Sequence, residues 1–275
     1  MMDNLIYNYD DALVVFAAGN EGSFDGSGDS TGDHSILDPG TSKNVLTVGA
    51  AETEITPSTV ASFSSRGPTT GNRIKPEVCG PGNPIYSASS SGSPGNATCR
   101  VSQKSGTSMA TPAIAGVAAL LRQFLVDGMH EIYSSAGYAD SDYNSSHPSS
   151  ALLKAMLIGS TIPLTTGYDS MGSPVTLANF YSASSPISDS APHALGTTGV
   201  DYHQGFGHVL LSNVLSLDGG FDTFLYESSL DAYGSFTLEF TVNSMAPEID
   251  ITLVWLDPPG SECKCCSCSQ NLCPI

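Results

Sequence analysis

The stretch Ser105-Gly-Thr-Ser-Met-Ala-Thr-Pro-Ala-Ile-Ala-Gly-Val-Ala-Ala-Leu-Leu-Arg122 predicts a helix with a serine near its start. Apolar side chains recur at helical spacing and are expected to form a buried stripe: Ile114, Val117, Ala118, Leu120 and Leu121. Small residues would let this helix pack closely against neighbouring backbone: Gly106, Ala110, Ala113, Ala115 and Gly116. Ser108 lies beside unpaired backbone N–H groups and the positive end of the helix dipole, which would stabilise an anion. A serine before an apolar helix is more often a cap than a nucleophile, so this stretch alone leaves both roles open.

A second stretch, Leu13-Val-Val-Phe-Ala-Ala-Gly-Asn-Glu-Gly22, is a short apolar run that ends in Gly-Asn. It predicts a buried parallel strand over residues 13–18, whose carboxyl end presents a polar side chain to a crevice. Residues 45–50 predict the neighbouring strand of the same sheet. The Asn20 amide can donate two hydrogen bonds, so with the start of the predicted helix it would complete an oxyanion hole.

Four motifs in this order resemble those of the subtilisin-like serine proteases, or subtilases: Ala17-Ala-Gly-Asn-Glu-Gly22, Phe63-Ser-Ser-Arg-Gly-Pro68, Lys75-Pro-Glu-Val-Cys-Gly-Pro-Gly82 and Gly106-Thr-Ser-Met-Ala-Thr-Pro112. The resemblance covers residue 5 to about residue 216. It implies an α/β fold, with part of a subtilisin-like parallel sheet flanked by helices. It also implies peptide-bond hydrolysis through an acyl-enzyme on Ser108, with Asn20 in the oxyanion hole.

The resemblance further implies a pocket for the side chain that precedes the scissile bond. Its wall and rim would be formed by Ala17, Ala18, Gly19 and Glu21, and the Asp38–Pro39 bond beside it is expected to be cis. Small walls admit a large substrate side chain, which indicates broad cleavage rather than cleavage after Arg alone. Glu21 would favour basic residues if it faces the substrate, whereas a hydrated surface carboxylate would have no such effect. The motifs at 63–68 and 75–82 are rich in Pro and Gly, so we expect them to form tight turns that act as scaffold.

A subtilase also needs a histidine to take the serine proton and an aspartate to orient that histidine. In the family, Asp-Thr/Ser-Gly and His-Gly-Thr motifs precede the Gly-Asn strand. Neither motif precedes Ala17, and none of the six histidines has the Gly-Thr context. We therefore expect the chain to be a fragment, the carboxyl-terminal half of a protease that begins inside a longer reading frame, and to be inactive as written. The alternatives are a catalytically inactive subtilase-like binding protein and, since Gly106–Ala110 nearly matches Gly-x-Ser-x-Gly, a different serine hydrolase.

Composition limits the partners. Nine Lys and Arg against 27 Asp and Glu give a formal net charge of −18, which repels phosphate backbones, so no nucleic acid is expected. The longest apolar run, residues 113–121, is too short to cross a bilayer, and the first residues do not form a signal peptide. We therefore expect polypeptide substrates and no membrane span. Sequons at Asn96 and Asn144 favour an extracellular or lumenal location for the full-length protein. No cofactor is certain, and Ca²⁺ is implied by the resemblance alone.

Three parts are expected along the chain. Residues 1–217 would be the carboxyl-terminal part of the catalytic domain, with an amphipathic helix over 151–160, an irregular region over 163–202, and a Gly-x-Gly turn and last helix within 204–215. Residues 218–262 would start an antiparallel β-sandwich of jelly-roll type, because 236–242 and 249–255 alternate with period two. Residues 263–275 form a cysteine-rich tail outside the family pattern, where a metal site is the minor alternative because histidine is absent. Cys79 and Cys99 would be either bridged or two buried thiols.

Overall fold

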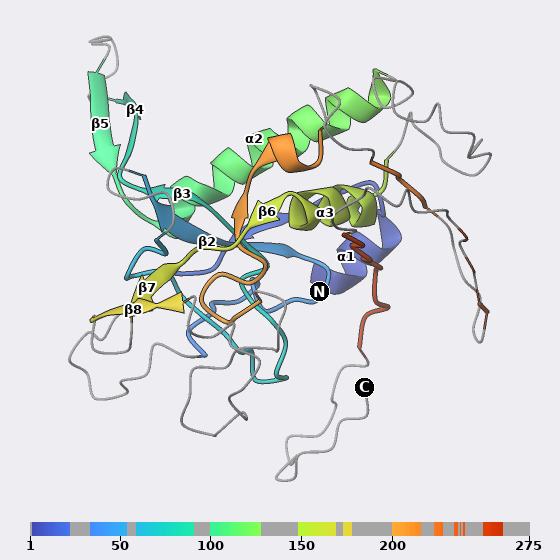
Figure 1. The fold of residues 1–275 in the computed structure, drawn as a ribbon, viewed down its shortest axis with the longest axis horizontal. Helices are drawn as coiled ribbons and strands as arrows, with labels where there is room; N and C mark the ends of the chain where they lie inside the picture. The colour runs from blue at the N-terminus through green and yellow to red at the C-terminus, as the bar shows by residue number, and fades with distance from the viewer. Residues whose placement is uncertain are drawn as a thin grey trace, which may run out of the picture.

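The computed structural model describes residues 2–22, 34–53, 59–90, 100–127, 148–168, 173–177, 200–215, 223–227 and 250–260, together with 234, 235, 237 and 239. Its elements in chain order are α1 (Met2–Asn8), β1 (Val15–Ala17), β2 (Leu46–Glu52), β3 (Val78–Asn83), β4 (Ile85–Ser89), β5 (Arg100–Lys104), α2 (Thr107–Val126), α3 (Ser150–Gly159), β6 (Thr161–Ile162), β7 (Thr166–Tyr168), β8 (Pro174–Thr176), β9 (His208–Val209) and the 3₁₀ turn η5 (Leu211–Asn213). Figure 1 shows α2 and α3 together on one side of the main sheet.

The main sheet has five strands in the order β1-β2-β3-β9-β6. β1, β2, β3 and β9 run parallel, and β6 runs antiparallel to β9. Val15 lies opposite Leu46, and Val48 lies opposite Val78. All of β2 except its last residue is buried, as expected for a strand of a parallel sheet that is covered on both faces. The two neighbouring parallel strands predicted over 13–18 and 45–50 are confirmed, but β1 is shorter than expected and only partly buried, because it is an edge strand of the described sheet.

Helix α2 packs across β1, β2 and β3. The predicted stripe is confirmed at Ile114, Ala118 and Leu121, which are at most 7% exposed, and Leu125 extends it. The prediction was wrong for Leu120, which is 57% exposed, because it lies about 100° around the helix from Leu121. Val117 is only partly buried.

The close approach of α2 to the sheet depends on glycines of β3 rather than on a glycine of the helix. A Cβ at Gly80 would lie 2.8 Å from Cγ1 of Ile114, and one at Gly82 would lie 3.3 Å from the Cβ of Ala110. At Gly116, by contrast, a Cβ would meet no atom within 4 Å. Ala110 is fully buried, so it does serve the close packing that was expected of the helix.

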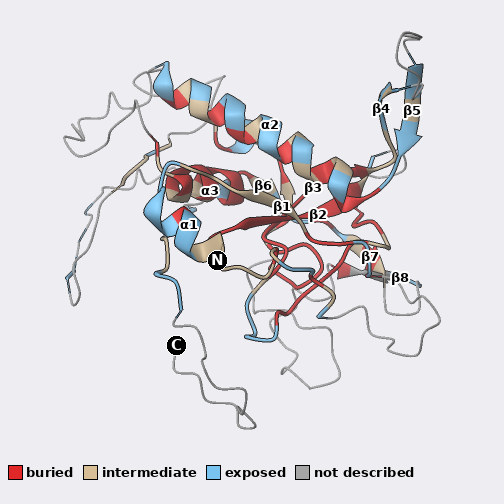
Figure 2. Ribbon diagram, turned by 180° about the vertical axis from the view of Figure 1, so that it is seen from behind, coloured by how far each residue is buried: buried red, intermediate tan, exposed pale blue. Residues whose placement is uncertain are grey.

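The other face of α2 is not covered by the part of the chain that the structure describes. Figure 2 shows exposed and buried surfaces alternating along this helix. Gly116 and Leu120 are exposed there, and the exposed Ala115 and Ala119 lie at the border of this face, next to the cavity described below. By length and composition, with a mean hydropathy of 1.5, α2 could cross a membrane, but its buried face packs on the sheet in the manner of a core helix.

The expected amphipathic helix over 151–160 is α3, and its N-cap Ser149 accepts a hydrogen bond from Leu152 N at 3.0 Å. The region 163–202 is not wholly irregular, because it contains the antiparallel hairpin of β7 and β8. The Gly-x-Gly turn is present, with φ of 63° at Gly205 and 122° at Gly207. The expected last helix is reduced to the short turn η5, because His208 and Val209 are used as β9 between β3 and β6.

Residues 250–260 run over the main body without strand pairing, so the predicted strand over 249–255 is not formed in its described part. Asn44 holds this segment: its Oδ1 accepts from Asp257 N at 3.0 Å, and its Nδ2 donates to Asp257 O at 2.9 Å. Asn44 N also donates to Oδ1 of Asp3 at 2.9 Å, so we name these three residues the Asn44 junction. Most of 236–242, the sequons, Cys99 and the tail 263–275 lie outside the described residues. Cys79 is a buried free thiol.

Candidate active site

Asn20 and Ser108 come from different elements that meet at the carboxyl edge of the sheet. Asn20 follows the last residue of β1 by three positions, and Ser108 is the second residue of α2. Asn20 Oδ1 accepts hydrogen bonds from Thr107 N at 2.9 Å and from Thr107 Oγ1 at 3.2 Å. The structure therefore places Asn20 against the residue that immediately precedes Ser108. These bonds use only the amide oxygen of Asn20, so its two N–H donors remain available to hydrogen-bond to another group.

Ser108 is not the cap of α2. The N-cap is Gly106, whose φ of 152° favours glycine, and it makes no side-chain cap bond. Ser108 itself is exposed, and its hydroxyl bonds to none of the described residues. Its backbone N–H belongs to the first turn, where helix donors have no partner within the helix. Of the two roles that the sequence left open for Ser108, the cap is excluded.

Thr107 is a positioning residue that the sequence analysis missed. Its side chain is buried, and its Oγ1 lies 3.2 Å from both the N and the O of Gly19. Together with the bonds to Asn20, this hydroxyl fixes the turn after β1 to the start of α2. The only signal in the sequence was a hydroxyl-bearing residue between the glycine and the serine.

The residues predicted to form the substrate pocket lie at the same edge but differ in access. Ala17 is partly buried, whereas Ala18 and Gly19 are buried. Ala18 donates to Val48 O and accepts from Leu37 N, both at 3.0 Å, so its backbone is fully used within the fold. The expected cis bond is present at Asp38–Pro39.

Glu21 is exposed at the rim, but its carboxylate folds back. Its Oε2 accepts from Asn20 N at 2.6 Å and from Ser65 Oγ at 3.0 Å, while its own N donates to Ser65 Oγ at 3.0 Å. The other oxygen, Oε1, bonds to none of the described residues. Glu21 is therefore held in one place with one carboxylate oxygen open, which is more ordered than a freely hydrated side chain.

The motif at 63–68 acts as scaffold for this turn. Ser64 Oγ accepts from Ala50 N at 3.0 Å, and Ser65 holds Glu21. The buried Arg66 donates to Gly22 O, to Tyr168 O at 2.6 Å and to His203 Nε2 at 2.7 Å. Since a guanidinium has no acceptor, His203 Nε2 must accept here and is committed to this structural network.

No described histidine bonds to Ser108. His34 lies in an exposed turn with φ of 57°, and His203 is bound to Arg66. His208 is in β9, where burial lowers its pKa. His130, His147 and His193 lie outside the described residues. The site therefore presents a serine and an amide without a proton acceptor from the described part of the chain.

A buried ionic cluster lies at the opposite, amino-terminal edge of the sheet. Glu77 Oε1 accepts from Lys75 Nζ at 2.6 Å and from Lys154 Nζ at 2.7 Å, and both lysines donate to Val45 O. Glu77 Oε2 accepts from Thr47 N at 2.8 Å. Burial lowers the pKa of Lys75 to about 8 although Glu77 opposes the shift. Burial by itself would raise the pKa of Glu77, but Lys154 and Lys75 hold it below its ordinary value. The cluster is structural, because it lies away from Ser108 and its polar atoms are paired with one another.

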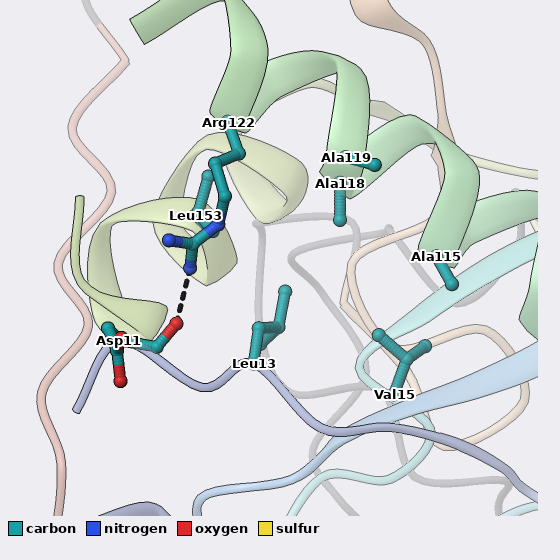
Figure 3. Close-up of a pocket in the computed structure, with 8 residues that line it drawn as sticks. All are labelled: Asp11, Leu13, Val15, Ala115, Ala118, Ala119, Arg122 and Leu153. Atoms are coloured by element: carbon teal, nitrogen blue, oxygen red, sulfur yellow. Dashed lines mark hydrogen bonds between the residues drawn. The ribbon is translucent and has the colours of Figure 1, made fainter. Parts of the chain in front are cut away.

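A cavity of about 320 Å³ lies between α2 and the segment before β1, as Figure 3 shows. Arg122 closes one end by donating to Asp11 O, and Leu13 and Val15 face Ala115 across the cavity. Ala115 is seven positions from Ser108, about 10 Å along the helix axis, so this cavity is not the predicted substrate pocket.

No group of three or more His, Cys, Asp or Glu side chains that could hold a metal ion occurs among the residues that the structure describes. The Ca²⁺ that the resemblance implies stays a prediction, and no step below uses a metal.

An exposed serine in the first turn of a helix that packs on a parallel sheet, beside an asparagine that follows the edge strand, is an arrangement typical of serine hydrolases with an α/β fold. The family model described as the Subtilase family matches residues 2–207, and the chain belongs to this family.

Two sequence relatives agree with this assignment. Serine protease AprX of Bacillus subtilis is 44% identical over 122 residues, which cover 40% of this chain and 26% of AprX. Serine protease/ABC transporter B family protein tagB of Dictyostelium discoideum is 30% identical over 239 residues, which cover 73% of this chain and 12% of tagB. Among solved structures, the prenylagaramide maturation protease PagA matches with a TM-score of 0.46 at 19% identity, over 76% of this chain and 51% of PagA. The chain therefore spans about half or less of each of these proteins.

Proposed function

We propose that this chain carries the nucleophile and the oxyanion hole of a serine endopeptidase that cleaves polypeptides. The observation that carries the proposal is the 2.9 Å hydrogen bond from Thr107 N to Asn20 Oδ1. Because Oδ1 accepts this bond, the Asn20 Nδ2 group remains available to donate, and Ser108 N, in the first turn of α2, has no acceptor among the described residues. Donors arranged in this way stabilise the negative charge that develops on a carbonyl oxygen under attack.

The reaction runs through an acyl-enzyme. Ser108 Oγ forms a bond to the scissile carbonyl carbon while its proton passes to a general base, and the carbonyl oxygen becomes an anion held by Asn20 Nδ2 and Ser108 N. The carbon–nitrogen bond then breaks, and the base returns the proton to the leaving amine. Water repeats the sequence on the ester and releases Ser108. The base and its orienting carboxylate are proposed to be the His and Asp of an upstream segment, because no described histidine bonds to Ser108.

Labelling with a fluorophosphonate probe tests the proposal. The 275-residue chain should not be labelled at an appreciable rate, because a serine hydroxyl without a base stays protonated. Addition of the upstream Asp- and His-bearing segment should restore labelling, and Ser108→Ala should abolish it. Labelling of the isolated chain through Ser108 at the rate of an intact subtilase would contradict the missing base.

The same experiment decides the second candidate, an inactive subtilase-like binding protein. The exposed Ser108 without a hydrogen-bonded base favours this alternative. A binding protein would remain unlabelled even when the upstream segment is restored, while still retaining polypeptides.

We also propose that the catalytic part ends near residue 217 and that a β-sandwich begins after it. Ile251, Leu253 and Trp255 support this division, since they alternate along the chain and are 76%, 76% and 66% exposed. An extended segment with one outward apolar face needs a second layer to cover it.

A further inference from the structure

The hairpin of β4 and β5 carries two isolated positive charges beside the candidate active site. β5 ends at Lys104, and only Ser105 and Gly106 separate it from α2. Figure 1 shows the hairpin projecting beyond the amino-terminal end of α2, and Figure 2 shows that its surface is largely exposed. Gly106 N donates to Gly82 O at 3.0 Å, which ties the base of the hairpin to β3.

Arg100 and Lys104 differ from the other cations of this acidic chain. Of the nine Lys and Arg residues, only Lys264 lies outside the described residues. Six of the remaining eight donate to carboxylate or carbonyl oxygens: Lys43, Arg66, Arg73, Lys75, Arg122 and Lys154. Arg100 and Lys104 are exposed and bond to nothing in the described part of the chain.

Both cations lie on one face of the hairpin. In the antiparallel register Lys104 pairs with Ile85 and Arg100 with Ser89, so Arg100 and Lys104 are four residues apart on the same strand. Alternate positions of a strand face the same way, and four residues span about 13 Å. The other face carries Tyr86 and Val101, which are 63% and 71% exposed. One face therefore carries both cations, and the other face, which also carries Gln103, has no charged side chain.

The hairpin and Glu21 flank the start of α2 from opposite sides. Glu21 follows β1, the hairpin follows β3, and β2 lies between these two strands in the sheet. A polypeptide that crosses Ser108 from the Glu21 side therefore continues toward the hairpin. If residues before the scissile bond occupy the Glu21 side, as the subtilase resemblance implies, residues after it meet Lys104 and then Arg100.

We propose that the cationic face of the β4–β5 hairpin is a subsite for acidic side chains on the leaving-group side of the scissile bond. Its preferred substrates carry Asp or Glu at two positions four residues apart, which matches the spacing of Lys104 and Arg100 in an extended chain. The formal net charge of −18 means that the rest of the chain repels carboxylates, so the attraction of an acidic side chain depends on these two cations. The proposal rests on the proposed function only in assigning the scissile bond to Ser108.

Peptide binding to the 275-residue chain tests the subsite without any need for catalysis. We would measure the fluorescence anisotropy of labelled decapeptides that differ only at two positions four residues apart, which carry Glu, Gln or Lys. At low salt the Glu peptide should bind about three- to tenfold more tightly than the Gln peptide, and the Lys peptide should bind most weakly. Arg100→Ser with Lys104→Ser should remove the difference, and so should added salt.

Arg73→Ser is the matched control for Lys104→Ser, because it removes one exposed charge near Thr41, away from the hairpin. Equal binding of the Glu and Gln peptides would overturn the subsite. An equal effect of Arg73→Ser and Lys104→Ser on the difference in affinity between these peptides would also overturn it. Ser108→Ala should leave the preference unchanged. The two proposals can also fail separately. If the protein with the upstream segment still prefers the Glu peptide but is not labelled by the fluorophosphonate, the subsite is supported and the protease is contradicted.

Discussion

At the scale of single residues, Asn20 is the group whose contribution can be measured most directly. In a protein that combines this chain with the proposed upstream segment, Asn20→Ala should lower kcat by about 10²–10³ with little change in KM, a magnitude taken from subtilisin, another member of the family. The reason is that the amide stabilises the oxyanion more than the bound substrate. Steady-state kinetics on one peptide substrate would show this, and a loss confined to KM would contradict the oxyanion role.

The Thr107 hydroxyl should contribute to the stability of the fold. Thr107→Val keeps the shape but removes the hydroxyl that meets Gly19 and Asn20, so we expect unfolding to become easier by about 1–3 kcal/mol. The control is Thr107→Ser, which keeps the hydroxyl and should stay close to wild type in urea denaturation. Equal losses in the two variants would show that packing, rather than the hydrogen bonds, fixes this turn.

Glu77 gives the molecule a pH-dependent stability. Its folded pKa is below the ordinary 4.5, so its contribution is fully present above pH 4.5 and is lost as the pH falls through the folded value. At pH 7, Glu77→Gln should lower the free energy of unfolding by about 3–5 kcal/mol, because it leaves Lys75 and Lys154 buried without a counter-charge.

Urea denaturation of both proteins from pH 7 downward is the measurement. The difference should begin to narrow below about pH 4.5, where the carboxyl takes up a proton in the unfolded state, and should be smallest once folded Glu77, whose pKa is lower, is protonated too and resembles glutamine. Glu52→Gln, which alters a partly exposed carboxylate bound to Asn83, is the control and should show a small difference throughout. A Glu77→Gln difference that does not vary with pH would contradict the charged state of the cluster.

The placement of Asn20 and Ser108 could be predicted from sequence because each lies in a short motif at the end of an apolar element. Thr107 and Ser65 could not be found in this way. Their partners lie 88 and 44 positions away along the chain, and a hydroxyl gives no periodic signal.

At the scale of elements, the two faces of α2 should respond differently to substitution. Leu121→Ala should lower the free energy of unfolding by about 2–5 kcal/mol, since its side chain is fully buried. Leu120→Ala should cost less than about 0.5 kcal/mol in the same chain, since this side chain is 57% exposed. Chemical denaturation of both variants is sufficient, and an equal cost would mean that something covers Leu120.

Periodicity also explains which elements could be predicted. β2 and α2 are long enough to show a clear apolar pattern, whereas β6, β7, β8 and β9 have only two or three residues each. Strands this short are fixed by long-range pairing, such as that of Cys79 with His208. The pattern of α2 predicted a helix but could not indicate which of its apolar side chains would stay uncovered.

At the scale of the whole molecule, the Asn44 junction should make α1 and the segment 250–260 one cooperative unit. Asn44→Ala removes its side-chain bonds to Asp3 and Asp257, so amide hydrogen exchange should become faster in both regions together. Exchange in the distant β4–β5 hairpin should not change. Faster exchange in only one of the two regions would show that they open independently.

The same junction brings the first helix and residue 257 within reach of one side chain, although 213 positions separate Asn44 from Asp257. Asp3 and Asp257 are therefore neighbours in the fold although they are far apart along the chain. Where two such segments can be joined by a short linker, circular permutation is tolerated, in which the order of the segments along the chain changes while their contacts are kept. For this chain, the spatial arrangement of Asn20 and Ser108 therefore does not require Asn20 to precede Ser108 along the backbone.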